Sequence, residues 1–283
     1  MKFSDSFNLW AGRMLAPSDR ANLSGPYYGN IGNGAPTGSR HYMNGNEQAG
    51  RDDGIAIWGN VGGDMKLKYQ VGIFDGNEAS TDEQMFAGRL VLNLWDDELG
   101  SNPAIGYYNA STYYGEKEIL AIGVSYQSES TQTGTPPNSV GAGGGGFEDA
   151  MAIDILVEKG IEGVGTGTLD LAWNDYSGVT TADDEDSVSV FVAILMDDEI
   201  SLGPMSGKLR PYIQYITDGA NGDEYAIGIQ HVINGHKASL CLEYRHWDGL
   251  GEGTGSPASG IDPAIPDADT DRSAVSLGLQ FQF

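Results

Sequence analysis

A two-residue alternation of apolar and polar side chains constrains the fold of this chain more than any other feature. It is clearest in the C-terminal stretch 272–283, RSAVSLGLQFQF, where Val275, Leu277, Leu279, Phe281 and Phe283 occupy every second position. Successive side chains of a β-strand point to opposite faces of the sheet. The stretch therefore predicts a strand with one apolar and one polar face.

The same alternation recurs upstream in segments that are separated by turn-rich stretches. Together with the C-terminal stretch we count about 12 predicted strands, an even number, as is typical of bacterial outer-membrane barrels. The predicted strands are 6–16, 54–61, 65–74, 84–95, 118–127, 150–157, 166–176, 187–196, 209–216, 224–233, 237–247 and 272–283. No segment of useful length has the helical period, and no apolar run approaches the roughly 18 residues of a transmembrane helix.

The connections between the predicted strands alternate in length. One set contains the long polar stretches 17–53, 128–149 and 248–271, whereas the other contains tight turns such as 62–64 and 234–236. Long loops on one side and short turns on the other are typical of outer-membrane barrels. The sequence therefore predicts an all-β fold, a transmembrane antiparallel up-and-down β-barrel that forms a single domain over residues 1–283. A soluble antiparallel sheet with one wet face would alternate in the same way.

In a membrane barrel the two faces of each strand have different roles. The apolar face contacts lipid, and aromatic residues near the strand ends form interfacial girdles. The girdle candidates are Trp95, Tyr126, Trp173, Tyr176, Tyr244 and Trp247. The polar face forms the pore wall, and the charged residues predicted to line it are Arg13, Lys66, Lys68, Arg89, Asp154, Asp170, Arg210, Glu243 and Arg245.

Fixed charges on a pore wall set its ion selectivity. One hypothesis is that the basic pore-lining residues form one wall and the acidic ones face it, which would leave modest selectivity. The alternative is that these charges satisfy one another in a wet interior, where isolated solvated pairs contribute little to stability.

The formal net charge is -25, from 15 Lys+Arg against 40 Asp+Glu. This excess argues against nucleic acid as a partner, because phosphate binding needs clustered cations. Most of the acidic excess lies in the connections, where it also serves solubility. Asp267, Asp269 and Asp271 match the start of a calcium loop, but the stretch lacks the central glycine and final glutamate of such a loop. Two interpretations stay open here, a Ca²⁺ site and a solvated acidic surface.

No enzymatic motif is apparent. The four histidines fall in no metal-ligand spacing, and the chain has no nucleophile elbow, so we predict no catalytic residues and no other cofactor. A single cysteine, Cys241, excludes an internal disulfide framework.

The stretch 8–30, NLWAGRMLAPSDRANLSGPYYGN, resembles the phosphate-selective porin (O and P type) superfamily of Gram-negative outer-membrane barrels. Members of that family carry a strand that ends in G-R/Q-x-x-x-P, followed by a loop with Ser and Arg. Here those positions are Gly12, Arg13, Pro17, Ser18 and Arg20. The stretches 107–126 and 209–212 are similar to these porins as well, and the terminal strand resembles the closing strand of such barrels.

The chain also differs from this family in two respects. The Gly-Arg strand of these porins lies well inside a barrel of about sixteen strands, whereas here it is N-terminal. A chain without its first strands, or a smaller barrel, would account for this position, and a signal peptide is expected to have been removed. The family's basic pore lining does not match the acidic composition, so phosphate selectivity is not expected.

The sequence thus predicts a porin of the cell outer membrane, a channel that passes small hydrophilic solutes or ions by passive diffusion. Its expected partners are outer-membrane lipid and lipopolysaccharide, the permeating solutes, and two further copies in a homotrimer. Two alternatives stay open. The barrel would act as a sheath or scaffold for a partner such as an electron-transfer protein, or the chain would be a soluble secreted β-sandwich that serves as a binding module.

Overall fold

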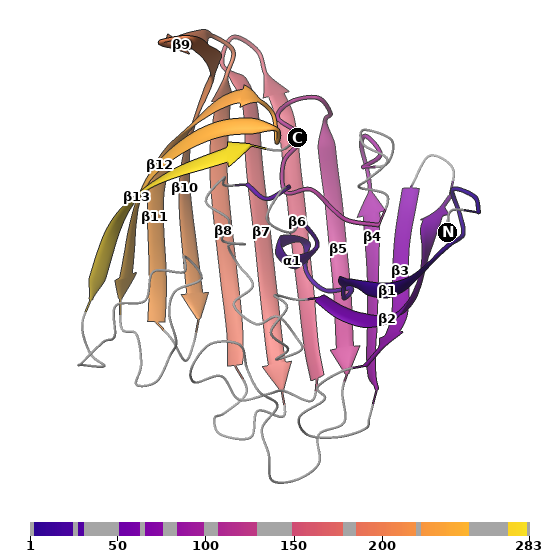
Figure 1. Ribbon diagram of the computed structural model, residues 1–283. Helices are drawn as coiled ribbons and strands as arrows, with labels where there is room; N and C mark the ends of the chain where they lie inside the picture. The colour runs from indigo at the N-terminus through magenta and orange to yellow at the C-terminus, as the bar shows by residue number, and fades with distance from the viewer. Residues whose placement is uncertain are drawn as a thin grey trace.

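The computed structural model describes residues 3–24, 28–30, 51–62, 66–75, 84–98, 107–128, 149–177, 185–218, 222–248 and 271–281. Their strands all belong to one antiparallel sheet (Figure 1). The strands are β1 (Asn8–Leu15), β2 (Arg51–Val61), β3 (Lys66–Phe74), β4 (Met85–Asn93), β5 (Ile119–Ser128), β6 (Asp149–Ile161), β7 (Gly165–Ser177), β8 (Glu185–Met196), β9 (Glu199–Leu202), β10 (Met205–Asp218), β11 (Gly222–Asn234), β12 (Ala238–Asp248) and β13 (Arg272–Phe281). The helix α1 (Arg20–Ser24) has five residues. In the described part of the chain no helix is long and apolar enough to span a membrane.

The sheet is an up-and-down meander, in which strands that follow one another in the chain lie side by side. The path runs from β1 to β13 in order, and only the four-residue β9 lies off it, paired with β10. Each strand predicted from the sequence overlaps one strand of this path, so the all-β antiparallel character is confirmed. We did not predict β9, because four residues are too few for a period-two pattern to be recognised.

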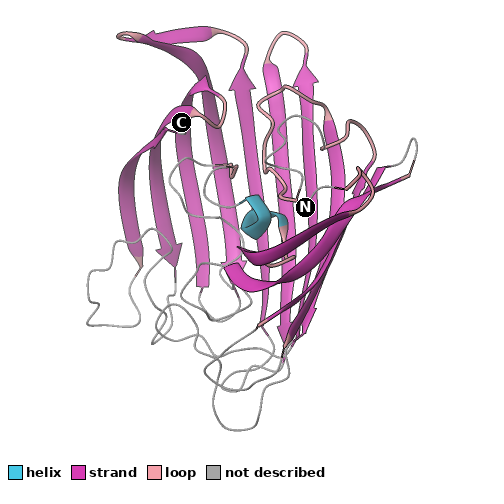
Figure 2. Cartoon of the chain, turned by 45° about the vertical axis from the view of Figure 1, so that its right-hand side comes forward, coloured by secondary structure: helices cyan, strands magenta, loops and turns pink. Residues whose placement is uncertain are grey.

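The two outer strands of the sheet are not paired with each other. Within the described residues β1 pairs with β2 and β13 with β12, so the sheet is open, and the closing role that the resemblance implies for the C-terminal strand is not shown. Gly12 stands opposite Gly54 in the β1–β2 ribbon and has a φ of +115°, a conformation that glycine adopts readily. Towards the end of β1, Met14 and Leu15 share an apolar cluster with Leu23 of α1. Figure 2 shows this ribbon passing in front of the sheet beside the helix.

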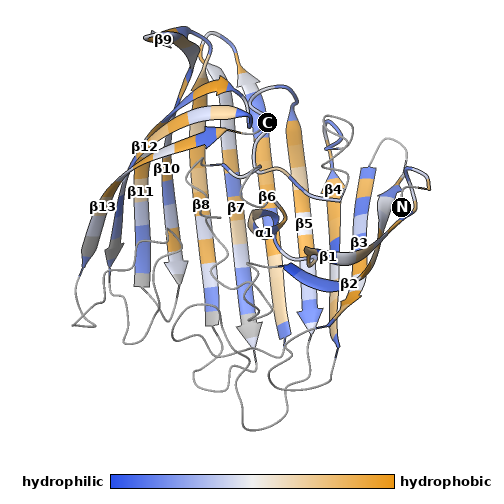
Figure 3. Cartoon of the chain, viewed as in Figure 1, coloured by the Kyte–Doolittle hydropathy of each residue, from blue (hydrophilic) through white to orange (hydrophobic). Residues whose placement is uncertain are grey.

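The curved sheet has two chemically distinct faces. Apolar and polar residues alternate along the strands (Figure 3). The outer, convex face carries exposed apolar side chains, and along β13 four of them are between 54% and 74% exposed: Val275, Leu277, Leu279 and Phe281. The opposite, concave face carries buried polar and charged side chains on several neighbouring strands. This arrangement is inverted relative to a soluble protein, whose apolar face is normally covered.

Two segments lie over the concave face. One is α1, in the β1–β2 connection, and the other is residues 107–118 of the β4–β5 connection, which we name the inner segment. The Tyr107 hydroxyl donates to the Leu15 carbonyl at 3.0 Å, and the Asn109 amide donates to the Leu23 carbonyl at 3.3 Å. At the other end, a ring nitrogen of His236 lies 2.9 Å from the Thr112 carbonyl. The inner segment is therefore bound both to α1 and to the β11–β12 turn.

Candidate functional site

The candidate site is the polar cluster between the concave face of β3–β7 and the two segments that cover it. It begins at α1, whose first turn is fixed by Asp19: its carboxylate accepts a hydrogen bond from the Asn22 amide at 2.9 Å, as an N-terminal cap does. This cap holds Arg20 against the sheet. The Arg20 side chain is almost completely buried, although it projects from a five-residue helix in a connection.

Asp154 of β6 is the centre of the cluster, because two arginines share its carboxylate. Arg89 of β4 donates to both oxygens, with Nη1–Oδ2 at 2.5 Å and Nη2–Oδ1 at 2.8 Å. Arg20 adds its backbone amide and its Nε, each at 3.2 Å. All three side chains are buried. Removing one partner of such a buried group leaves an uncompensated charge, which typically costs about 3–5 kcal/mol.

The Arg89–Asp154 pair spans an intervening strand, because β5 lies between β4 and β6. Gly123 is the β5 residue opposite Asp154 in the register. A Cβ atom there would lie 2.7 Å from Asp154 Oδ1 and closer still to Arg89 Nη2. Glycine at position 123 therefore allows the two side chains to meet across β5.

Glu98, in the β4–β5 connection, completes the charge balance around Arg20. Its Oε1 accepts from Arg20 Nη1 at 2.5 Å and from the Tyr113 hydroxyl at 3.0 Å, while Oε2 accepts from Asn109 Nδ2 at 3.1 Å. Burial by itself would raise the pKa of Glu98, but Arg20, Lys68 and the Tyr113 hydrogen bond outweigh burial and hold the pKa below its ordinary value. Burial would likewise lower the pKa of Arg20, and its two carboxylates raise it instead.

Glu158 of β6 anchors the middle of the inner segment. Its Oε1 accepts from the amides of Tyr113 and Gly115 at 3.0 and 2.9 Å, and its Oε2 accepts from the Thr112 and Thr168 hydroxyls at 2.6 and 3.0 Å. Among the described residues no cation lies within ion-pair distance of it, so these hydrogen bonds, with the more distant charge of Arg210, compensate a fully buried carboxylate.

Tyr114 lies between the two amides that Glu158 binds, and it is the one non-glycine residue with positive φ in the described ranges, at +53°. This conformation turns its ring towards β10 and β11. The guanidinium of Arg210 lies 5.3 Å from the Tyr114 ring centre and 5.2 Å from that of Phe191. The Tyr114 hydroxyl accepts from Gln230 Nε2 at 3.2 Å. The inner segment thus reaches from β3 to β11 across the concave face.

Most of the predicted pore-lining residues lie on the concave face, but their environments differ from the prediction. Lys68, Arg89, Asp154, Arg210, Glu243 and Arg245 are buried. Lys68 donates to the Tyr108 carbonyl at 2.5 Å, and Asp170 accepts from Asn30 at 2.8 Å. Lys66 is half-exposed and 3.7 Å from Asp97. Arg13 is exposed and pairs with Asp53 of β2, its register partner in the ribbon that passes over the concave face.

The expected separation of bases and acids onto facing walls is not observed among the described residues. Arg89 meets Asp154 two strands away, and Arg245 of β12 pairs with Glu243 on its own strand and Glu224 on the next. Sequence reasoning did not select Arg20, Glu98, Glu158 or Glu224 as site residues. The first two lie in connections without a periodic pattern, and Glu158 follows the predicted strand 150–157, whereas β6 continues to Ile161.

The hydrogen bonds and ion pairs of this cluster hold the inner segment against the sheet. Four cations, Lys68, Arg20, Arg89 and Arg210, lie among five carboxylates, Asp19, Glu98, Asp154, Glu158 and Asp170. No group of three potential metal ligands occurs within the described ranges. Of the calcium candidates, Asp267 and Asp269 lie outside the described residues and Asp271 is exposed. No family model, curated protein or solved structure matches this chain.

Proposed function

We propose that this protein is an outer-membrane β-barrel of the porin type that passes small hydrophilic solutes or ions by diffusion. The observation that carries the proposal is the inverted arrangement of the sheet. Exposed large apolar side chains occur on the outer face from β2 to β13, and the buried charges lie on the other face. Apolar surface of that extent marks an interface, and lipid is the partner that fits a whole convex face.

Strand length supports a membrane location. Every strand of the meander after β1 has between 9 and 14 residues. A tilted transmembrane strand needs about 9–11 residues to cross the hydrocarbon core. The meander connectivity also matches outer-membrane barrels, in which each strand pairs with the next one in the chain.

Aromatic residues near the strand ends support the same proposal. Tyr126 and Tyr244 are exposed on the outer face near the ends that lead into the long connections, and Trp95 is exposed at the opposite end of β4. The side chains of Tyr176 and Trp247 lie outside the described residues. Rings at two levels of an apolar face fit the two interfaces of a membrane.

A membrane location requires the edges of the sheet to be paired. Each unpaired backbone group in the hydrocarbon core costs several kcal/mol, so we propose that β13 and β1 are joined in the membrane, directly or through further strands. This is also what the resemblance to phosphate-selective porins implies. In such a barrel the inner segment lies in the lumen and narrows it, and pore width and wall charge together select the solutes.

Planar-bilayer recording tests this function. We expect the chain refolded in detergent to give discrete ion-conducting steps. Replacing residues 108–116 by a short Gly-Ser linker should widen the lumen and raise the unitary conductance. Glu162→Gln, a change in the exposed β6–β7 turn, serves as the control and should leave the conductance unchanged. A chain that stays monomeric without detergent, ignores lipid vesicles and gives no conductance would contradict the proposal.

A further inference from the structure

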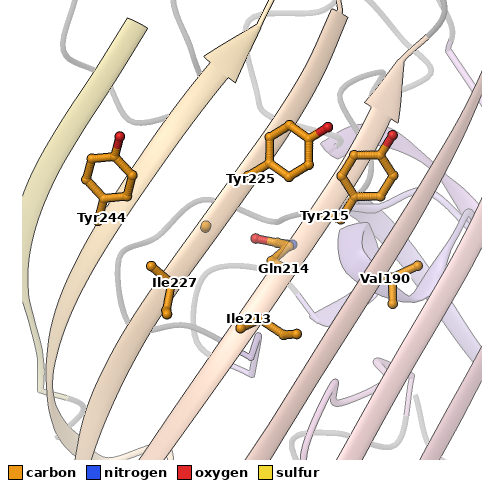
Figure 4. A pocket seen from close by; sticks show the side chains of 8 residues that line it. Val190, Ile213, Gln214, Tyr215, Tyr225, Ile227 and Tyr244 are labelled. Carbon is orange, nitrogen blue, oxygen red and sulfur yellow. The ribbon is translucent and has the colours of Figure 1, made fainter.

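A hollow of about 310 Å³ lies on the outer face over β8, β10, β11 and β12 (Figure 4). Three tyrosines border it, and their hydroxyls already have partners in the chain. Those of Tyr215 and Tyr225 donate to Asp223 Oδ2 at 3.0 and 3.3 Å, and that of Tyr244 lies 2.9 Å from the Ser273 hydroxyl. Bonded polar groups identify no ligand. Buried polar groups without a partner are more informative, because each one costs stability until something binds it.

Such unpartnered groups gather on the concave face of β2, β3 and β4. Among the described residues, the amides of Asn60 and Asn93 have no hydrogen-bond partner at either oxygen or nitrogen, and Gln70 has none at Oε1. Asn60 is the register partner of Lys68, and Asn93 that of Lys66. Side chains directly opposite each other lie about 5 Å apart. These five side chains therefore form one group, which we name the amide patch.

The surroundings of Asn93 show that packing alone does not explain its amide. Val91, two residues earlier on the same face, and Ala121, its register partner on β5, belong to an apolar cluster with Ala110 and Tyr113 of the inner segment. A leucine has nearly the shape of an asparagine and would leave no polar atom unpaired there. Proteins break such rules of stability mainly at functional sites.

The two lysines of the amide patch each lie near a carboxylate. Lys66 is 3.7 Å from Asp97, and Lys68 donates to the Tyr108 carbonyl and is attracted by Glu98. An anionic ligand would meet these carboxylates as well as the ammonium groups. The free amides offer N–H donors and carbonyl acceptors without charge. They match hydroxyl groups, because a hydroxyl both donates and accepts.

An aromatic cluster borders the amide patch. Trp58, two residues before Asn60 on the same face of β2, is half-buried, and its ring centre lies 6.2 Å from that of Tyr107. Tyr107 in turn lies 5.2 Å from Trp10. The face of an aromatic ring is negative, so the weakly positive C–H groups of a sugar ring pack well against it. An indole beside free amides thus suits a compound that carries both hydroxyl and C–H groups.

We propose that the amide patch, with Trp58 at its edge, binds an uncharged polyhydroxylated solute, such as a monosaccharide, in the lumen. The proposal rests on the proposed porin function and deepens it, because it names a class of solute. The solute enters from the side of Asn60, Lys66 and Trp58, all of which are half-buried. The flexible Lys66 side chain stands opposite Asn93 and moves aside to admit it.

Block of the ion conductance by glucose tests this site. The full chain is inserted into a planar bilayer, glucose is added stepwise, and the half-blocking concentration is measured. Asn93→Leu should raise this concentration by about tenfold, since it removes the amide and keeps its shape, and Asn60→Leu should raise it severalfold. Inorganic phosphate at the same concentrations should leave the glucose block unchanged. Displacement of glucose by phosphate would overturn the uncharged class of solute.

Asn174→Leu is the matched control, because Asn174 is a buried asparagine on the concave face of β7 whose amide is bonded, to Ser187 Oγ at 3.3 Å. This variant should lower the urea midpoint in detergent and leave the glucose block unchanged. Asn93→Leu should weaken the block without lowering the midpoint.

The outcomes separate the site from the porin function. A glucose block that is the same in Asn93→Leu as in the wild type means that the amide holds ordered water only, and overturns the site. If Asn93→Leu forms no channels, Asn60→Leu decides in the same way. A wild-type chain without conductance overturns the proposed function and the site together, whereas a conducting chain that glucose does not block overturns the site alone.

Discussion

The concave face of the sheet has two regions that use charge differently. Over β4–β6 the charged side chains meet partners from distant connections, as Arg89 and Arg20 do at Asp154, and α1 and the inner segment cover them completely. Over β10–β12 the ion pairs of Arg245 with Glu224 and Glu243 join neighbouring strands, and Tyr212 of β10 donates a hydrogen bond to Glu243 at 2.7 Å.

The difference indicates a division of roles. Charged side chains that bind a covering segment stabilise the folded structure. If one of them is removed, its partner stays buried away from water without an opposite charge. The second cluster carries two carboxylates against one guanidinium and lies near the strand ends that lead to the long connections. In the proposed porin, the first region controls stability and the width of the lumen, and the second contributes net negative charge to its wall.

The largest effect is expected from Asp154→Ala. The substitution leaves Arg20 and Arg89 buried without their shared carboxylate, and should lower the free energy of unfolding by about 3–5 kcal/mol. Urea titration in detergent micelles or lipid vesicles measures this. Glu162→Gln removes a carboxylate from the exposed β6–β7 turn and should leave the midpoint unchanged. Equal midpoints for the two variants would contradict a stabilising role of the cluster.

A smaller effect is expected from Gly123→Ala, which tests the crossing of β5 by the Arg89–Asp154 pair. The added methyl group overlaps both side chains, and overpacking of this kind costs about 1–3 kcal/mol. Gly88→Ala on β4 is the matched control, because its new Cβ would meet its nearest neighbour, Phe86, at an ordinary 3.8 Å. If the two variants were equally stable, the pair would not depend on the close approach at position 123.

The comparison also shows what a sequence can and cannot predict. The positions of the strands, and the place of Arg89 and Arg210 on the polar face, followed from the two-residue alternation. The partners of these arginines did not. Glu98 belongs to a connection that folds back over the sheet, and Asp154 is bound from α1, 134 residues away in the chain. No local period encodes contacts between a connection and a distant strand, since their side chains need only meet in space.

The position of Arg13 also depends on a contact between segments that are not neighbours in the sheet. The alternation in β1 predicted that Arg13 lines the pore. The covering of Met14 and Leu15 by α1 draws β1 over the concave face, and Arg13 is left outside with Asp53. Tertiary packing of two apolar residues overrode the alternation.

The third effect is a dependence on pH in the covered region. Glu98 has a folded pKa below its ordinary value of 4.5, so its contribution to stability is complete above that value and is lost as the pH falls through the lower, folded pKa. Glu98→Gln should therefore be less stable than the wild type at pH 6, and this gap should narrow below about pH 4.5. Urea midpoints between pH 3 and pH 6 measure it. Glu116→Gln, at an exposed position of the inner segment, is the control and should change the urea midpoint little at pH 6.

The smallest effect is expected in the second region, and it concerns selectivity. Arg245→Gln removes the one cation of the β11–β12 cluster and leaves Glu224 and Glu243 facing the lumen of the proposed pore. Because fixed charge on the wall attracts counter-ions, the reversal potential in a salt gradient should shift by a few millivolts towards the value for cations, and more at low than at high salt. Lys159→Gln removes the same charge from an exposed site on the outer face and should leave the reversal potential unchanged. If instead Arg245→Gln lowered stability as much as Asp154→Ala without altering selectivity, the two regions would share one structural role and the division between them would fail.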